Sequence, residues 1–296
     1  MKRCAFLTLE DPTGYVIDDD LAYQPLQDLG WRVDAVPWSR PGVSWSSYDA
    51  VVIRSTWDYA EVPQKFLATL AEIEQSGAPL FNDLQTVRWN LDKTYLRSLA
   101  ERGVPIVPTA WRERLRRGEL AALFDEAGME EIVVKPVVGA GAIGAFRLER
   151  GALTPQRAAE VETYYAERAL MAQPFLTAIT SEGEYSLFYF NGQFSHAIQK
   201  VPQPGDFRVQ EEHGSRILAA APDAQLLAAG DRAVTAIGDP PLYARADLVR
   251  ANDDNDFWLI ELELVEPSLY LRMDEQSPQR FAKALDRRVK GSQSGR

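Results

Sequence analysis

The sequence is poor in the side chains that form cross-links and bind soft metals, with one cysteine and two histidines among 296 residues. Cys4 has no second cysteine to pair with, and it lies in the apolar run CAFLTL, so we expect it to be buried and without a catalytic role. His196 and His213 lie far apart in the sequence and lack the spacing of metal ligands. These shortages argue against a disulfide-bonded fold and against a zinc site.

Positive charge and long apolar runs are also scarce. The 43 acidic residues outnumber the 32 basic ones, and the net charge of −11 argues against a general nucleic-acid-binding protein or a protein of acidic membrane surfaces. Any anionic ligand therefore needs a local basic pocket. No run of about 18 apolar residues could span a membrane, and the N-terminus lacks the apolar segment of a signal peptide, so we predict a cytoplasmic protein.

The first half of the chain alternates between β and α patterns. Strand and helix patterns follow one another at residues 3–9, 21–30, 31–38, 48–55 and 63–77. This order predicts a small lobe built on a parallel sheet. Further helices are expected at 91–103, 115–128 and 154–168, with strands at 104–111, 131–138 and 169–175.

The second half carries long runs in which apolar and polar residues alternate. A tight turn is expected at Asn191-Gly192, and a second strand pair is expected at 242–250 and 256–267. These patterns predict antiparallel sheet. The predicted fold class is therefore α/β, changing to α+β in the C-terminal half.

The segment Val133–Ala145, VVKPVVGAGAIGA, places a lysine at the end of a β-branched run and three glycines just beyond it. Gly139, Gly141 and Gly144 can adopt positive φ and let backbone N–H groups approach anionic oxygens, and Lys135 adds a positive charge. The pattern indicates a loop that covers a phosphate chain. An ordinary hairpin turn is the alternative, and no GxxxxGK[ST] motif is present there.

Three carboxylates are expected to meet on two neighbouring strands. Glu261 and Glu263 lie two residues apart in FWLIELELVEP and so project from the same face, while Asp247 lies in the apolar strand before them. At about 5 Å each pair would repel by roughly 1–3 kcal/mol, so a cation should neutralise them. Hard oxygen ligands favour Mg²⁺ or Mn²⁺. The alternative is an exposed strand with solvated glutamates.

With both features present, the chain resembles the ATP-grasp enzymes, and among them the glutathione-synthetase-like branch, over about residues 86–273. The resemblance implies an ATP-grasp fold, in which two lobes close over ATP, preceded by an N-terminal parallel-sheet pre-grasp domain. We therefore expect a substrate domain at 1–85, a small lobe with the phosphate lid at 86–172, and a C-terminal lobe with the metal site at 173–290. Residues 291–296 look like a disordered tail.

The resemblance also assigns residues to the nucleotide. Lys93 in WNLDKTYL and Lys135 in VVKP match two nucleotide-binding lysines, the segment Gln173–Leu176 resembles the adenine-binding hinge, and Glu184 matches an acidic position near ribose or substrate. The implied ATP site consists of Lys93, Lys135, Gly139, Gly141, Gly144, Gln173, Pro174, Phe175, Leu176 and Glu184. Asp247, Glu261 and Glu263 match the metal ligands, although many relatives have asparagine at the last position.

In this family, ATP phosphorylates a substrate carboxylate, and an amine-type nucleophile attacks the acyl phosphate. Two arginines are the catalytic candidates. Arg208 in GDFRVQ resembles the arginine near the acyl phosphate, and Arg245 lies two residues before Asp247, on the same face of its strand. A buried structural ion pair is the alternative for both arginines.

Substrate recognition is expected in the first lobe and in the segment EPSLY after the metal strand. The loop RSTWD follows a predicted strand, at the edge where open α/β sheets bind ligands. Arg54 could bind a carboxylate and Asp58 an ammonium group, with a simple loop cap as the alternative. The full set of predicted substrate contacts is Arg54, Ser55, Thr56, Trp57, Asp58, Lys200, His213 and Ser268, with His196 beside them.

The motifs RSTWDY, WNLDKTYL, KPVVGAGA, GDFRVQ and ELELVEPSLY are similar to those of the O-ureido-serine cyclo-ligases of cycloserine biosynthesis and their relatives. The similarity implies ring closure of an amino-acid derivative by an ADP-forming ligase that uses ATP and Mg²⁺ or Mn²⁺. The alternatives are an intermolecular amide or peptide ligase, a nucleotide-binding module without turnover, and a kinase-like phosphotransferase. The expected partners are ATP and a small amino-acid-like carboxylate, with no nucleic acid or membrane, and a homo-oligomer is left open.

Overall fold

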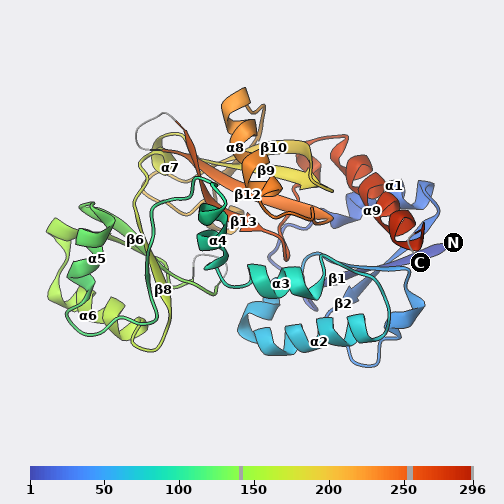
Figure 1. Cartoon of the computed structure of the whole chain (residues 1–296), viewed down its shortest axis with the longest axis horizontal. Coiled ribbons are helices and arrows are strands. Elements are labelled where there is room, and N and C mark those ends of the chain that lie inside the picture. The colour runs from blue at the N-terminus through green and yellow to red at the C-terminus, as the bar shows by residue number, and fades with distance from the viewer. Residues whose placement is uncertain (140–142, 252–255, 295–296) are drawn as a thin grey trace.

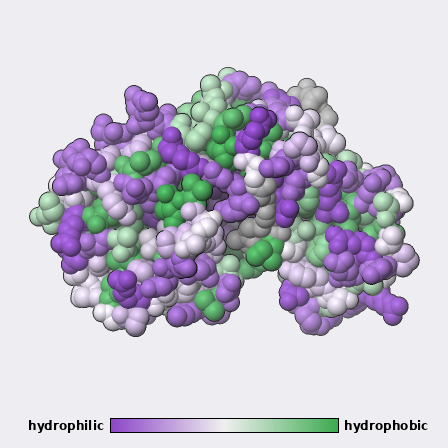
Figure 2. Space-filling model, turned by 180° about the vertical axis from the view of Figure 1, so that it is seen from behind, coloured by the Kyte–Doolittle hydropathy of each residue, from purple (hydrophilic) through white to green (hydrophobic). Residues whose placement is uncertain are grey.

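Three β-sheets organise the chain. The computed structural model describes residues 1–139, 143–251 and 256–294, without the side chains of His213 and residues 292–294. The sheet of the C-terminal half lies between the two others, so the molecule has a central part and two outer lobes (Figure 1). The surface is mostly hydrophilic, and a notch separates the two outer lobes (Figure 2).

The N-terminal lobe contains a parallel sheet with the order β2-β1-β3-β4. Its strands are β1 (Lys2–Thr8), β2 (Trp31–Pro37), β3 (Ala50–Ile53) and β4 (Leu80–Phe81), and its helices are α1 (Tyr23–Asp28) and α2 (Pro63–Gln75). All four residues of β3 are buried, as expected of a parallel strand covered on both faces. The predicted parallel-sheet lobe is confirmed.

The second lobe contains an antiparallel sheet with the order β5-β8-β6-β7. The elements are β5 (Ala110–Arg112), α5 (Leu120–Ala127), β6 (Glu131–Pro136), β7 (Phe146–Glu149), α6 (Pro155–Tyr164) and β8 (Leu170–Pro174). Ile132 and Val134 belong to the same core as the two helices, so the alternate residue Lys135 faces the opposite side of the sheet.

The central sheet is antiparallel, with the order β11-β10-β9-β12-β13. Its strands are β9 (Glu184–Phe190), β10 (Gln193–Val201), β11 (Arg216–Ala220), β12 (Tyr243–Arg250) and β13 (Phe257–Glu263), and α8 (Ala224–Thr235) packs against it. Asn191 and Gly192 both have positive φ, 49° and 73°, as a two-residue hairpin of the primed type requires. The predicted hairpin and the predicted strand pair are confirmed.

The C-terminal helix α9 (Ser277–Ser294) packs on the N-terminal lobe beside α1 (Figure 1). Phe281 contacts the rings of Phe6 in β1 and Phe190 in β9, and Asp286 accepts a hydrogen bond from Trp31 Nε1 at 3.1 Å. The helix therefore joins the first lobe to the central sheet. It also corrects the predicted tail at 291–296, because helical backbone continues through residue 294 and only the last two residues lie outside the described chain.

The remaining helices are short. They are α3 (Leu84–Asn90), α4 (Tyr95–Glu101) and α7 (Ala178–Ser181), and the 3₁₀ turns are Asp19–Ala22, Trp45–Ser47, Trp57–Glu61, Arg150–Ala152, Glu211–His213 and Leu271–Met273. Within the described ranges, none of the helices combines the length and the apolar character that crossing a bilayer requires. The three sheets fall at 2–81, 110–174 and 184–263, while the domain boundaries themselves stay a prediction.

Candidate active site

The candidate site lies on β12 and β13, whose register sets acidic and basic residues side by side. Asp247 is paired with Glu261, and Arg245 is paired with Glu263. β13 is an edge strand, so its outer backbone groups need other partners. The Asn90 amide donates to Leu262 O at 2.7 Å and accepts from Leu264 N at 2.8 Å, and the Tyr95 hydroxyl accepts from Leu262 N. These contacts fix the strand that carries both glutamates.

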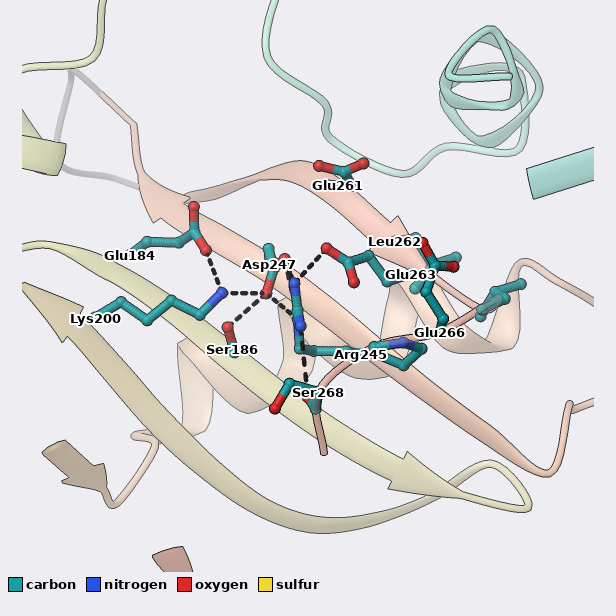
Figure 3. Close-up of polar contacts among 12 residues, drawn as sticks. Glu184, Ser186, Lys200, Arg245, Asp247, Glu261, Leu262, Glu263, Glu266 and Ser268 are labelled. Atoms are coloured by element: carbon teal, nitrogen blue, oxygen red, sulfur yellow. Dashed lines mark hydrogen bonds and ion pairs between the residues drawn. The ribbon is translucent and has the colours of Figure 1, made fainter. Parts of the chain in front are cut away.

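Arg245 is the centre of a buried ion network (Figure 3). Its Nε and Nη2 donate to the two Asp247 oxygens, each at 2.9 Å, and Nη2 also bonds Glu263. Nη1 donates to Ser268 O at 3.4 Å, so the segment after β13 is tied to the same guanidinium. The bidentate fork–fork geometry fixes the orientation of Asp247.

Lys200 extends the network across β10 and β9. Its Nζ lies 2.9 Å from Glu184 Oε1 and 3.4 Å from Asp247 Oδ1, and Ser186 donates to the same Asp247 oxygen. Burial alone would raise the pKa of Asp247, but Arg245 and Lys200 hold it below its usual value. The predicted ribose or substrate contact Glu184 is therefore an ion-pair partner here, and the predicted substrate contact Lys200 is buried between two carboxylates.

Glu261 and Glu263 differ in their surroundings, although both are on one strand. Glu261 stands apart from the chain of contacts in Figure 3 and pairs with Lys93, 2.9 Å away. Burial would raise the pKa of Glu261, but the positive charges of Lys93 and Lys135 lower it below its usual value. Burial raises the pKa of Glu263 to about 8, because Arg245 offsets only part of the desolvation and both Asp247 and Glu261 add repulsion. The site thus brings four carboxylates, of Glu184, Asp247, Glu261 and Glu263, together with four cations, of Lys93, Lys135, Lys200 and Arg245.

The donor chemistry of this set fits a hard divalent cation, since it offers carboxylate oxygens on adjacent strands and no sulfur. Among the described residues, however, no three His, Cys, Asp or Glu side chains converge closely enough to hold a metal ion. Lys93 pairs with Glu261, and Arg245 pairs with both Asp247 and Glu263. The identities of the residues therefore suit Mg²⁺, while the side chains are paired with internal cations.

The two predicted nucleotide lysines both lie near Glu261. Lys93 Nζ contacts Glu261 and also donates to Gly139 O at 2.8 Å, so it joins the glycine-rich segment to the catalytic strand. Lys135 makes no hydrogen bond or ion pair with any described residue, and burial, together with the positive charge of Lys93, lowers its pKa despite the attraction of Glu261. A half-buried ammonium group without a partner among the described residues suits an anionic ligand.

The glycine-rich segment is described only in part. Gly144 has φ 75°, and a Cβ there would lie 2.3 Å from the Tyr164 hydroxyl, so glycine is required. Gly139 does not have positive φ, contrary to the prediction, but its carbonyl accepts from Lys93. Gly141 lies outside the described residues.

The predicted hinge Gln173–Leu176 leads from the second sheet toward the central one. Phe175 N donates to Glu131 O at 2.9 Å, and the Arg147 guanidinium lies 3.7 Å from the centre of the Phe175 ring. Gln173 donates to the Thr109 hydroxyl, and Leu176 is buried in a small apolar cluster with Val107 and Val249. Such an apolar shelf with main-chain polar groups is compatible with a flat heteroaromatic ring.

The structure gives Arg54 another role than carboxylate binding. The side chain is 2% exposed, its Nε donates to Asp19 Oδ1 at 2.9 Å, and its Nη2 donates to Pro267 O at 3.1 Å. All its nitrogens have protein partners, since Nη1 contacts Ile53 O. The interpretation of Arg54 as a substrate-binding residue is therefore corrected to a structural ion pair.

Replacing Arg54 by methionine should lower the free energy of unfolding by about 3–5 kcal/mol, because Asp19 would remain buried without its counter-ion. Urea unfolding of purified variants measures this loss. The exposed pair Arg157–Glu160 provides a control, and Arg157→Met should change stability by less than about 0.5 kcal/mol. Unchanged stability of Arg54→Met would restore the ligand-binding interpretation.

The rest of the RSTWD loop is fastened to neighbouring segments. Asp58 accepts from Trp38 Nε1 at 2.6 Å, and Trp57 Nε1 donates to Glu266 O at 2.9 Å. The hydroxyls of Ser55 and Thr56 are buried and have no hydrogen-bond partner among the described residues. Asp58 is thus engaged, while the two hydroxyls retain their hydrogen-bonding capacity.

Two predicted residues lie away from the ion network. Arg208 is exposed and pairs with Asp206, Nη2 to Oδ2 at 2.7 Å, so the structure does not bring it to Arg245. His196 is buried, stacks on Phe188, and has Nε2 3.0 Å from Leu269 O, and burial lowers its pKa to about 4, which gives it a structural role. The His213 side chain lies outside the described part of the chain.

Sequence reasoning missed several residues of this region. Asn90 and Tyr95 satisfy the edge of β13, and Arg147 covers Phe175. Asn90 and Tyr95 flank Lys93 in the segment WNLDKTYL, so their proximity to a recognised motif was an available signal. No comparable signal marked Arg147.

Two family models match the chain. The model described as "D-cycloserine synthetase DcsG, N-terminal domain" matches residues 4–82, and the model described as "Prokaryotic glutathione synthetase, ATP-grasp domain" matches residues 114–245. The first match covers the parallel-sheet lobe. The second runs from the second lobe to β12 and includes Lys135, the hinge and Arg245.

Whole-chain relatives agree with these matches. The chain is 32% identical to the cycloserine biosynthesis protein DcsG of Streptomyces lavendulae over 295 residues, covering 95% of this chain and 97% of the relative. It is 26% identical to a glutathione synthetase of Ralstonia nicotianae, covering 82% of this chain and 73% of that one. The crystal structure of D-cycloserine synthetase DcsG superposes with a TM-score of 0.82 at 31% identity, covering 97% and 99% of the two chains. The chain therefore belongs to the ATP-grasp superfamily, in the glutathione-synthetase-like branch that includes DcsG, and it is an ADP-forming ligase that uses ATP and Mg²⁺.

Proposed function

We propose that this ligase activates the carboxylate of a small amino-acid-like substrate and closes a ring with a nitrogen of the same molecule. The observation that carries the proposal is that the glycine-rich segment and the predicted metal ligands lie close together. Lys93 joins the glycine-rich segment to Glu261, and Glu261 pairs with Asp247 across the strands. The similarity to DcsG over nearly the whole chain, including the N-terminal lobe, supports the cyclising reaction over other ligase reactions.

In the proposed site, ATP lies between the second sheet and the central sheet. The Gln173–Leu176 hinge would hold the adenine ring, Lys93 and Lys135 would bind phosphate oxygens, and Glu184 would contact ribose or substrate after separating from Lys200. Asp247, Glu261 and Glu263 would hold Mg²⁺, which neutralises charge on the phosphate oxygens. Gly139, Gly141 and Gly144 would cover the phosphates.

The chemistry follows from the positions of these groups. The substrate carboxylate takes the γ-phosphoryl group and becomes an acyl phosphate. A nitrogen of the substrate then attacks the carbonyl carbon, the carbon–oxygen bond to phosphate breaks, and the nitrogen loses a proton. Arg245 lies two residues from Asp247 and would stabilise negative charge on the transferred oxygens. Arg208 would have to leave Asp206 to act there.

An intermolecular ligase is the second candidate, supported by the similarity to glutathione synthetase. In that reaction the nucleophile comes from another molecule, while activation of the carboxylate is the same. The two reactions differ in product and in whether a second substrate is required.

Mg²⁺-dependent ADP release with hydroxylamine present tests the activation step. Across a panel of amino acids that includes O-substituted serines, we expect one class to give ADP together with a hydroxamate in equal amounts. Without hydroxylamine, a cyclic product from a single substrate would establish ring closure, and a requirement for a second amine would establish the intermolecular reaction. ATP binding without any acid-dependent ADP release would refute the ligase assignment, and a stable phosphorylated product would instead identify a phosphotransferase.

A further inference from the structure

Glu266 is a partly buried carboxylate at the seam between the first lobe and the central sheet. It begins the segment EPSLY, in which substrate recognition was expected, but it was not itself assigned a role. It follows β13 by three residues, and its own carbonyl accepts from Trp57 Nε1 at 2.9 Å. The next carbonyl, of Pro267, accepts from Arg54. Two hydrogen bonds from the RSTWD loop thus fix the backbone on which Glu266 stands.

The Glu266 side chain lies close to the ion network but is not part of it. Figure 3 shows it beyond Glu263, without any of the dashed contacts that join Glu184 to Ser268. Lys93 and Arg245 both act on Glu266 electrostatically, and the Tyr59 hydroxyl interacts with it as a hydrogen-bond donor. Glu266 therefore lies on the first-lobe side of the predicted phosphate and metal site.

The cations around Glu266 are engaged elsewhere. Lys93 pairs with Glu261, Arg245 pairs with Asp247 and Glu263, and Arg54 pairs with Asp19. Within the described ranges, the Glu266 carboxylate itself forms no ion pair. Burial raises its pKa to about 7 against the opposing effects of Tyr59 and Lys93, as expected of an acid with too little positive charge near it.

The loop that holds this segment supplies two further polar groups. The Ser55 and Thr56 hydroxyls are buried without a hydrogen-bond partner among the described residues, and such groups cost roughly 1–3 kcal/mol each when they are left unpaired. Hydroxyls and a carboxylate accept hydrogen bonds from N–H groups. Neutral hydroxyls are weaker ligands for Mg²⁺ than carboxylates, so the combination favours a nitrogen cation over a second metal ion.

We propose that Glu266, supported by the Ser55–Thr56 loop, binds the free α-ammonium group of an amino-acid substrate. The inference rests on the proposed function, because it places the substrate carboxylate beside Arg245 and the phosphate site. The carboxylate of a zwitterionic substrate would then lie beside Arg245, and its ammonium group would lie beside Glu266. Each charge of the substrate would face the opposite charge on the protein. The substrate class is thereby narrowed to acids whose α-amino group is free.

The role moves ammonium recognition from Asp58 to Glu266. Asp58 accepts a hydrogen bond from the Trp38 indole at 2.6 Å, whereas among the described residues the Glu266 carboxylate has a hydrogen-bond donor in the Tyr59 hydroxyl and no ion-pair partner. The two carboxylates can be compared directly by removing one charge at a time without changing size.

Steady-state kinetics of Glu266→Gln and Asp58→Asn test the proposal, with O-ureido-serine and its N-acetyl derivative as probes. We expect Glu266→Gln to raise the KM for O-ureido-serine about 30- to 100-fold, the effect of losing a charge-assisted hydrogen bond, with the KM for ATP changed less than about twofold. Wild type should reject the N-acetyl derivative, and Glu266→Gln should lose most of that discrimination. Glu266→Asp, which keeps the charge, should recover part of the affinity.

The matched control is Glu72→Gln on the exposed face of α2, which should behave as wild type. An unchanged KM for the acid in Glu266→Gln, or a larger effect of Asp58→Asn, would overturn the proposal. So would a raised Mg²⁺ requirement with an unaltered acid KM, because that pattern identifies a metal ligand. Hydroxamate formation by wild type separates these results from failure of the ligase assignment, which would leave every acid inactive.

Discussion

Lys135→Met should weaken ATP binding by about 100-fold or more while leaving the protein at least as stable as wild type. The Lys135 side chain is half-buried on the side of β6 opposite the lobe's core, has no partner among the described residues, and is repelled by Lys93. Its desolvation therefore costs free energy that only an anionic ligand recovers. Methionine keeps the length and apolar surface of the side chain and removes the charge. Calorimetric titration with ATP and Mg²⁺, together with urea unfolding, measures both effects.

The opposite behaviour would show that Lys135 is a structural residue. Loss of stability with unchanged ATP affinity would remove it from the nucleotide site. Lys65→Met is the control, since Lys65 lies over the Trp38 ring in the first lobe, far from the cleft in sequence and fold, and its loss should leave ATP binding unchanged.

Glu261→Gln should lower kcat by about 10²–10³-fold, an effect of about 3–4 kcal/mol that is typical of removing one group that stabilises transition-state charge. The substitution keeps the size of the side chain and removes the charge that would hold Mg²⁺. The fold should persist, because the side chain is 28% exposed and its partner Lys93 keeps its hydrogen bond to Gly139 O. Turnover measured over a range of Mg²⁺ concentrations, with circular dichroism as the check on folding, gives the result.

Glu182→Gln provides a matched comparison, since Glu182 is 26% exposed and pairs with Arg250 of β12 at 2.8 Å. It should retain wild-type turnover and an unaltered Mg²⁺ dependence. If Glu261→Gln did the same, the metal site would have to lie elsewhere.

The elements that were predicted well are those in which the local sequence pattern matches the structure that the surrounding fold requires. The first lobe alternates β and α patterns, and Asn191-Gly192 can adopt the positive φ that the hairpin needs. The strand predicted at 104–111 shrank to Ala110–Arg112, since Pro105 and Pro108 cannot donate backbone hydrogen bonds. The sequence thus contained the signals for the first lobe and the hairpin, and also the two prolines that shorten the strand, which were overlooked.

Other elements were missed although a local signal was present. Asp83 and Asp223 accept hydrogen bonds from Thr86 N and Leu226 N and so begin α3 and α8, as N-cap residues do. The aspartate that begins each helix was therefore a signal in the sequence that was overlooked.

The residues of the candidate site were likewise predicted only in part. Asp247, Glu261 and Glu263 were placed together correctly, because strand periodicity fixes which side chains share a face. The partner of Arg54 could not be predicted, since Asp19 is distant in sequence and nothing local indicates the contact. Glu266 lies in the segment EPSLY, where substrate recognition was expected, but its own role depends on which cations the fold leaves free.

The position of α9 has a consequence for synthesis of the chain on the ribosome. The core that contains Phe6 and Trp31 also contains Phe281 and Leu285. About 200 residues separate the end of the first lobe from α9. At a synthesis rate of roughly 5–20 residues per second, the apolar face of the first lobe stays uncovered for about 10–40 s until α9 has been made. The first lobe therefore depends on the last helix, and the nascent chain has to remain protected from aggregation until that helix has left the ribosome.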